Sequence, residues 1–341
     1  MRLLLAALVA AGALAATRLP AATSPAPAQP FTFAAFGCMP YGRLEGADAA
    51  FERLIAEVNR HDPAFSVHLG DIIGGEDLCT DALLLHRRDQ FNRFDSALVY
   101  TPGDNEWTDV YQERAGKLVP AERLAKIRSL FFAEERSLGR RPLPLVTQRR
   151  DPAHATFVEN ARWAHRGVVF ATVHVVGSQN NRLPAVPGAL EEAETRDLAN
   201  EAWLRATFTA ATADQARAVV LFFQADPFAA DRGRPGYDAP FERVLKTIEA
   251  EARAFARPVL LVHADEHRYR LDVGLRFQRD AAPVPNVTRL ETFGAQNLHA
   301  VLVTVDPEST QVFAAGPLLV PGNALPVLPR PKAPAKAAPA K

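Results

Sequence analysis

Short apolar segments recur along the chain, and the stretches between several of them have helical periodicity. The segment "FTFAAF" is typical of a strand, and after it apolar residues recur at helical spacing from Phe51 to Val58. The first three predicted strands are 31–36, 65–69 and 97–101, and further helices are predicted at 83–94, 120–136 and 190–212.

Three longer apolar runs do not alternate with polar residues, which is typical of strands covered on both faces. After residue 268 the helical pattern fades and only short strand-like segments follow. The apolar runs are 168–176, 218–223 and 258–263, and the later segments are 268–273, 288–293, 300–306 and 310–315. Strands alternating with helices, followed by strands alone, predict an α/β protein with additional sheet structure packed on the first sheet. We expect one domain over 31–318.

The two ends of the chain differ from this domain in composition. One arginine precedes fourteen apolar residues, Leu3–Ala16, a run shorter than the ~20 residues of a membrane-spanning helix. We expect a signal peptide at 1–22, a Pro/Ala linker at 23–30 and a flexible Pro/Ala/Lys tail at 319–341. The protein is then exported, periplasmic or secreted, without an integral membrane segment once the signal is removed. The alternative is an uncleaved membrane anchor.

The charge of the chain argues against a nucleic-acid partner. Lysine and arginine together number 39, as do aspartate and glutamate, so the formal net charge is zero. Proteins that bind nucleic acid depend on a basic surface to neutralise phosphates, and no basic excess is present in this composition.

Polar clusters follow the strand-like segments. Ligand sites in α/β sheets form at the carboxyl ends of strands, where loops converge. The clusters are "GCMPYG" (37–42), "GDIIGG" (70–75), "GDNEW" (103–107), "GSQNN" (177–181), "QADP" (224–227) and "HADEH" (263–267).

Four of the side chains in these clusters suggest a metal centre. Asp71, Asp104, Asp265 and His267 offer oxygen and nitrogen ligands, and carboxylates gathered at one rim would repel one another without a cation between them. The alternative is that these residues only stabilise turns through local hydrogen bonds.

The order of these clusters resembles that of the calcineurin-like metallophosphoesterase superfamily, which carries its metal ligands in D-x-H, GD, GNH, His and GHxH motifs after successive strands. The altered motifs also resemble those of a bacterial exported subgroup. The resemblance implies a four-layer α/β/β/α fold, a double β-sandwich flanked by helices. It also implies that Asp71 bridges the metals, that Asp104 replaces a ligating Asn, and that Asn105 replaces a His that assists the leaving group.

The remaining candidates rest on the same resemblance. "ADEHRY" keeps the ligand spacing through Asp265 and His267, and His263 is a further candidate ligand. Gln224 stands near an expected histidine, and Cys38 takes the position of the first aspartate. The catalytic candidates are Asn105, as a hydrogen-bond donor to phosphate, and His267.

The function implied is metal-dependent hydrolysis of a small phosphoester, with one or two divalent ions of zinc, iron or manganese. Because Asn105 cannot transfer a proton, we expect slow turnover on unactivated esters. The alternative is a catalytically inactive binding protein of the cell envelope that retains the phosphoesterase fold.

Cys38 has three possible states. It can form a disulfide with Cys79, bind zinc as a thiolate, or remain a free buried thiol. Elsewhere, His68 and His174 are expected to bond to backbone in the core. Glu106 is expected to support the metal ligands from behind.

Overall fold

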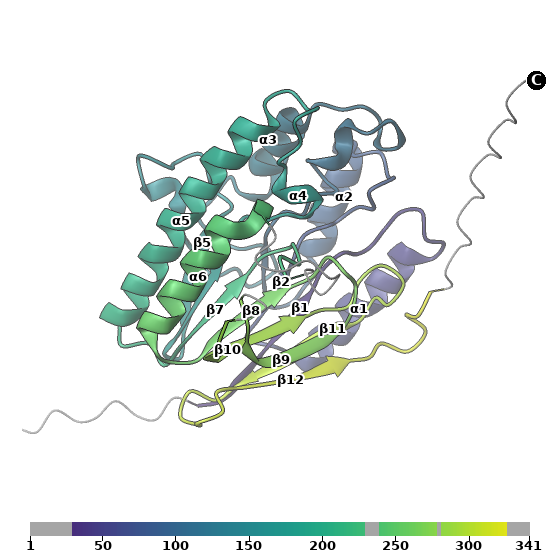
Figure 1. The fold of residues 1–341 in the computed structure, drawn as a ribbon. Helices are drawn as coiled ribbons and strands as arrows, with labels where there is room; N and C mark the ends of the chain where they lie inside the picture. Colours follow the sequence, from purple (N-terminus) through teal and green to yellow (C-terminus); the bar gives the residue numbers. More distant parts are fainter. Residues whose placement is uncertain (1–28, 229–238, 278–280, 326–341) are drawn as a thin grey trace, which may run out of the picture.

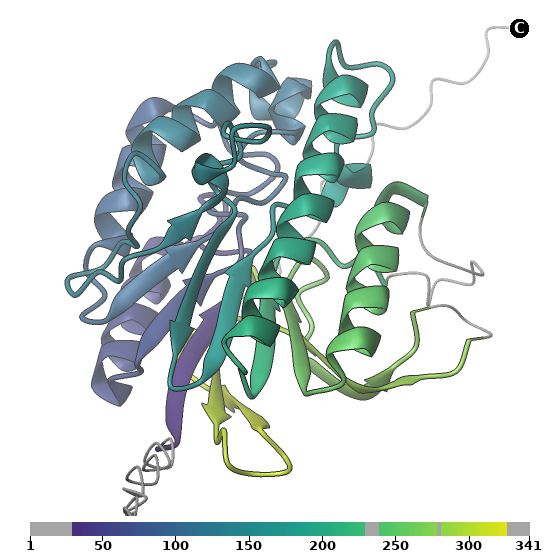
Figure 2. The ribbon, with the colours of Figure 1, turned by 90° about the vertical axis from the view of Figure 1, so that its left-hand side faces the viewer.

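Two β-sheets pack face to face, and helices cover the outer face of each (Figures 1 and 2). This arrangement is seen in a computed structural model that describes residues 29–228, 239–277 and 281–325. The α/β architecture with four layers, predicted from the motif resemblance, is confirmed.

The first sheet has five strands in the order β12-β11-β1-β2-β3. Its three parallel strands β1, β2 and β3 run side by side, β11 pairs with β1 in antiparallel orientation, and β12 pairs with β11 in antiparallel orientation. The register pairs Phe36 with His68 and His68 with Tyr100, so the three parallel strands end level with one another. The strands are β1 (Phe31–Phe36), β2 (Phe65–His68), β3 (Ala97–Tyr100), β11 (Ala300–Val305) and β12 (Phe313–Leu318).

The second sheet has seven strands in the order β4-β5-β6-β7-β8-β10-β9. Its four central strands, β6, β7, β8 and β10, are parallel. The strands are β4 (Val146–Thr147), β5 (Ala161–His165), β6 (Val168–Thr172), β7 (Ala218–Phe222), β8 (Val259–His263), β9 (Arg270–Leu275) and β10 (Val284–Glu291).

Three hydrophobic layers hold these elements together. Between the sheets, aromatic rings interdigitate: Phe33 lies edge-on to Phe222, with ring centroids 5.6 Å apart. Helices α1 (Ala47–His61), α2 (Asp81–Phe91) and α3 (Pro120–Phe131) pack against the five-stranded sheet. Helices α5 (Ala189–Ala213) and α6 (Glu242–Phe255) pack against the seven-stranded sheet. Shorter helical segments are α4 (Gly177–Asn180) and 3₁₀ turns at Asp109–Tyr111, Glu113–Ala115, Gln148–Arg150 and Ala239–Phe241.

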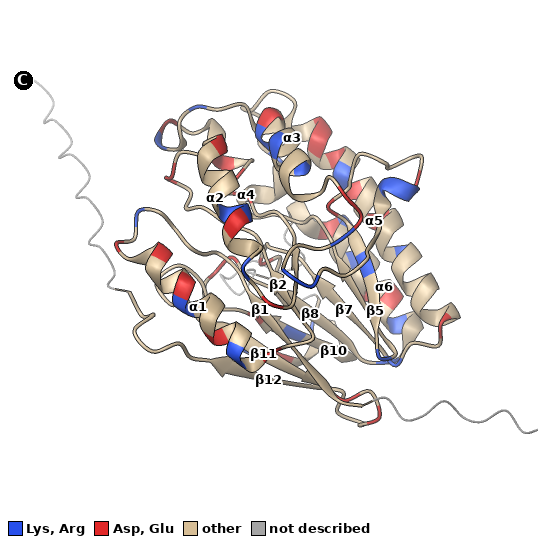
Figure 3. Ribbon diagram, turned by 180° about the vertical axis from the view of Figure 1, so that it is seen from behind, with Lys and Arg blue, Asp and Glu red and all other residues tan. Residues whose placement is uncertain are grey.

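Along the helices, ribbon segments of Lys and Arg (blue) and of Asp and Glu (red) are interspersed (Figure 3). Ion pairs join neighbouring helices, such as Arg123 to Asp81 at 2.7 Å and Arg205 to Glu251 at 3.0 Å. Within the described residues, no helix is long and apolar enough to cross a membrane.

The packed chain extends past the predicted domain boundary at residue 318. Asn323 is fully buried, and its Nδ2 donates to the carbonyl oxygens of Ala50 and Leu298. Leu325 N donates to Gln296 O. The tail prediction is therefore wrong for 319–325, because these hydrogen bonds fix the segment against α1. The predicted signal peptide and residues 326–341 of the tail lie outside the described residues.

Two core histidines differ in their partners. His68 Nε2 lies 2.9 Å from Met39 O, which confirms the expected bond to backbone. His174 Nδ1 instead lies 2.7 Å from Glu159 Oε1, and both side chains are fully buried. The prediction for His174 is wrong because Glu159, itself paired with Arg128 at 2.6 Å, gives the imidazole a charged partner.

Candidate metal centre

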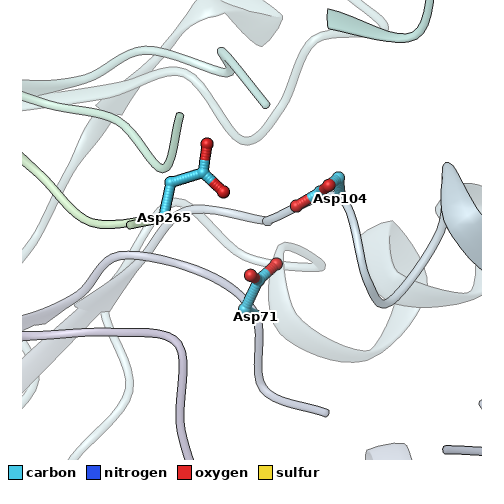
Figure 4. Close-up of side chains that lie close together, drawn as sticks. All are labelled: Asp71, Asp104 and Asp265. Atoms are coloured by element: carbon cyan, nitrogen blue, oxygen red, sulfur yellow. The ribbon is translucent and has the colours of Figure 1, made fainter. Parts of the chain in front are cut away.

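Three aspartates converge at the carboxyl ends of strands from both sheets. Asp71 follows β2, Asp104 follows β3 and Asp265 follows β8. Each offers a carboxylate oxygen, and these oxygens all lie within 4.8 Å of one another. Figure 4 shows the three side chains pointing toward a common space. We call these three residues the acidic cluster.

The electrostatics of the acidic cluster favour a cation. Burial, and then the neighbouring carboxylates, raise the pKa of Asp71 well above its usual range, and burial and Asp104 do the same for Asp265. Within the described part of the chain, the buried Oδ1 atom of Asp104 has no hydrogen-bond partner. Since an unpaired buried carboxylate oxygen is costly, this donor set fits a divalent ion.

Glu106 supports the acidic cluster from behind. Its Oε1 accepts hydrogen bonds from Asp71 N at 3.2 Å, Gly103 N at 2.7 Å and Tyr100 Oη at 2.8 Å. Burial raises its pKa to about 7. The side chain therefore joins the two loops that carry Asp71 and Asp104, which is the supporting position expected from the sequence.

Gln224, after β7, contacts the acidic cluster through its amide nitrogen. Nε2 donates to Asp71 Oδ2 at 3.2 Å and to Asp265 Oδ1 at 3.1 Å. Its Oε1 accepts from Gly177 N at 2.6 Å. In this geometry Gln224 links the two carboxylates, and its oxygen faces the backbone of the next loop.

Cys38 lies at the edge of the acidic cluster and is not bridged to Cys79. Its thiol lies 3.4 Å from Asp71 Oδ2, and its sulfur accepts from Asp265 N at 3.2 Å. Cys79 donates to Glu106 O at 3.1 Å, and both cysteines are free. The disulfide alternative is therefore wrong here, because separate partners hold the two thiols. Burial, with Asp71 and Asp265 nearby, raises the pKa of the Cys38 thiol well above its usual range.

The two catalytic candidates lie beside the acidic cluster and share a partner, Tyr41. His267 Nε2 lies 3.2 Å from Tyr41 Oη, and Asn105 Nδ2 donates to the same oxygen at 3.3 Å. Asn105 Nδ2 also donates to Ile73 O at 3.2 Å, so protein groups take both amide hydrogens. Burial lowers the pKa of His267 to about 4, which makes the ring neutral at neutral pH.

His263 lies farther from the centre. Its Nδ1 lies 3.0 Å from Ala264 O, and its ring stacks parallel to Phe223 with centroids 5.7 Å apart. Its Nε2 lies 3.9 Å from Asp226 Oδ1. Burial lowers the pKa of His263 to about 4.

Sequence reasoning missed Ser178, the serine of "GSQNN". Its Oγ lies 2.8 Å from Asp104 Oδ2 and 2.6 Å from Asp109 Oδ1. Asn180 and Asn181 of the same segment are buried, and their amides donate to Asp197 and Glu192 of helix α5. The apolar segment before this loop indicated its position at the sheet edge, but not which side chain faces inward.

The backbone around the centre is strained. Five non-glycine residues that line it have positive φ, a conformation that costs about 1–2 kcal/mol for an L-residue. Such residues concentrate at functional sites, where surrounding contacts hold them in place. They are Cys38 (52°), Asp71 (55°), Ser178 (46°), Asp265 (83°) and His267 (62°).

Several solved structures match this arrangement of two mixed sheets flanked by helices. Among them, the structure of PhoD superposes with a TM-score of 0.52 and 14% sequence identity; the match covers 83% of this chain and 66% of PhoD. At this identity the likeness concerns the fold alone.

Two further phosphatase structures match at lower scores. A dimetal phosphatase from Danio rerio has a TM-score of 0.49 and 11% identity, covering 86% of this chain and 99% of that one. A purple acid phosphatase from yellow lupin seeds has a TM-score of 0.48 and 11% identity, covering 86% of this chain and 55% of that one. No family model matches the sequence, and the search of curated proteins gave no match.

Proposed function

We propose that this protein is an exported, metal-dependent hydrolase of small phosphoesters. The observation that carries the proposal is the convergence of Asp71, Asp104 and Asp265 within 4.8 Å, from loops far apart in the sequence. Burying three carboxylates together without a counter-charge is strongly unfavourable, so a cation is the natural complement of this site.

Each group has a part in this proposal. The acidic cluster would hold one or two ions of zinc, iron or manganese, and Cys38 and His267 at its edge would be further ligands. Bound divalent ions lower the pKa of water and offset the charge of phosphate oxygens. Asn105 donates to a phosphate oxygen if it exchanges one of its two present acceptors. Asn105 cannot protonate the leaving group, so esters with good leaving groups are the favoured substrates.

The proposal is tested by metal analysis and a substrate panel on the purified protein. We expect about one or two equivalents of divalent metal per chain and faster hydrolysis of aryl than of alkyl phosphates. Asp71→Asn removes one charge with little change of shape and should weaken metal binding and abolish turnover. Asp89→Asn is the matched control, because the Asp89 side chain is 69% exposed on helix α2. Equal activity in the wild type and Asp71→Asn contradicts the proposal.

The export part of the proposal rests on the sequence of residues 1–22. Expression of the full chain in a Gram-negative host, followed by fractionation and N-terminal sequencing, tests it. A mature protein that starts near residue 23 in the periplasm is the expected result, and an intact N-terminus in the cytoplasm contradicts it.

A second candidate is a binding protein with this fold and no catalytic activity. It is favoured by the hydrogen bonds that occupy both amide hydrogens of Asn105 and the Nε2 atom of His267. The same experiments separate the two functions: stoichiometric metal without turnover on any phosphoester supports the binding protein.

A further inference from the structure

The hydroxyl group of Tyr41 lies between three residues of the candidate site. Tyr41 is the tyrosine of "GCMPYG", in the loop after β1, and it was not among the candidate site residues. Its Oη lies 3.2 Å from Asp71 Oδ2, 3.2 Å from His267 Nε2 and 3.3 Å from Asn105 Nδ2. These three partners belong to loops after β2, β8 and β3, so one hydroxyl connects three separate segments.

The number of hydrogens available assigns a direction to each contact. A phenolic hydroxyl has one hydrogen to donate, and its oxygen has two lone pairs. Asp71 Oδ2 is surrounded by donors, since Gln224 Nε2 also donates to it at 3.2 Å, and this oxygen therefore accepts from Tyr41. Asn105 Nδ2 can only donate, so it takes one lone pair of the Tyr41 oxygen.

The remaining lone pair of Tyr41 faces His267. Because the single hydroxyl hydrogen is already given to Asp71, the contact at 3.2 Å requires a hydrogen on His267 Nε2. In a neutral imidazole the other nitrogen, Nδ1, then carries the lone pair. The imidazole ring packs closely against Gly294, since a β-carbon at that position would lie 2.4 Å from Cδ2 of His267.

We propose that Tyr41 is a positioning residue that fixes the tautomer of His267 with hydrogen on Nε2, and that also orients the Asp71 carboxylate and the Asn105 amide. The lone pair of His267 Nδ1 is thereby the one left to act as a ligand or to accept a proton. Any part that Nδ1 has in turnover rests on the proposed function. The assignment of the tautomer does not depend on that function.

The experiment measures imidazole nitrogen signals by two-bond ¹⁵N–¹H correlation in the full chain labelled at histidine, after chelation and again with zinc added. A His267→Gln spectrum identifies the signals of His267. In the wild type we expect the hydrogen on Nε2. Tyr41→Phe keeps the ring and removes the hydroxyl, and it should shift the tautomer ratio by about five- to tenfold toward Nδ1–H, the effect of losing one hydrogen bond.

Tyr269→Phe is the matched control. Tyr269 lies two residues from His267, but its hydroxyl donates to Ala315 O at 3.2 Å, so its removal should leave the His267 signals unchanged. A wild-type ring with the hydrogen on Nδ1 overturns the proposal, and this result does not require that Tyr41→Phe folds. An unchanged ratio in a folded Tyr41→Phe protein also overturns it.

A kinetic measurement extends the test to the proposed function. In the zinc-loaded protein, Tyr41→Phe should lower kcat on an aryl phosphate about 10–100-fold with little change in KM, as is typical when a group that orients metal-site residues is lost. Tyr269→Phe should leave kcat and KM unchanged. If the wild type shows no turnover, the proposed function fails, while the nitrogen signals still decide the role of Tyr41.

Discussion

Gly70 and Gly103 lie in direct backbone contact, because the two loops that carry Asp71 and Asp104 cross at these residues. A β-carbon on Gly70 would lie 2.4 Å from Gly103 N, and one on Gly103 would lie 2.1 Å from Asp71 Oδ1. Gly70 also has φ of 83°, whereas Gly103 is needed for close approach alone. At each glycine, atoms of the other loop therefore occupy the space that a side chain would need.

Gly103→Ala tests this crossing. The added methyl group has to displace either the Asp71 carboxylate or its backbone, so we expect a loss of about 3 kcal/mol or more in the free energy of unfolding and loss of bound metal. Denaturant unfolding and metal analysis measure the two effects. Gly316→Ala is the control, because a β-carbon there meets no atom within 4 Å, and it should change stability by less than about 0.5 kcal/mol. If Gly103→Ala and Gly316→Ala have the same stability and metal content, the two loops do not contact each other at Gly70 and Gly103.

Metal affinity should rise with pH. The pKa values of Asp71 and Asp265 are raised by burial and by neighbouring carboxylates, so the metal-free protein retains protons there that a cation must displace. Each displaced proton makes affinity increase about tenfold per pH unit. Zinc titrations between pH 6 and 8 should give a slope of about one to two in log affinity per pH unit. Asp71→Asn should lower this slope by about one. A zinc affinity of the wild type that does not change with pH contradicts the raised pKa values of Asp71 and Asp265.

Ser178 should show the strain in its loop. Ser178→Ala and Ser178→Gly both lose the hydroxyl contacts to Asp104 and Asp109, but glycine adopts φ of 46° without strain. We expect Ser178→Gly to be more stable than Ser178→Ala by about 1 kcal/mol, with equally weakened metal binding. At Ser129, inside helix α3, the order should reverse, since glycine costs about 1 kcal/mol relative to alanine in a helix. Thermal or denaturant unfolding measures the stabilities of Ser178→Ala, Ser178→Gly, Ser129→Ala and Ser129→Gly.

The two cysteines should behave as independent thiols. Titration of the protein denatured without reductant should detect two free thiols, and fewer would indicate a disulfide. Cys38→Ser should weaken metal binding about 10–100-fold, because its sulfur contacts both Asp71 and Asp265. Cys79→Ser should leave affinity unchanged, since its thiol contacts only the backbone oxygen of Glu106 among the hydrogen-bond acceptors described.

The sequence determined most of the fold because periodicity is a local property. Phe31–Phe36 forms a strand as predicted, and the helical spacing from Phe51 to Val58 lies within α1. Helix α6 and the short strands β4 and β5 were not predicted. The segment 161–165, "ARWAH", is too short and too mixed in polarity to be recognised as a strand, and its pairing with β6 defines it. The predicted strand 168–176 ends at Thr172, where the chain leaves the sheet.

For the candidate site, the sequence by itself placed Asp71, Asp104 and Asp265 directly after strands, because a carboxylate that follows a buried strand is visible in one short segment. Only the tertiary structure decided which neighbours each group has. Tyr41, Ser178 and the unbridged Cys38 acquire their roles from contacts with residues at least 30 positions away. Such contacts depend on how the two sheets pack, and the distances between atoms in separate loops are not encoded in any local pattern.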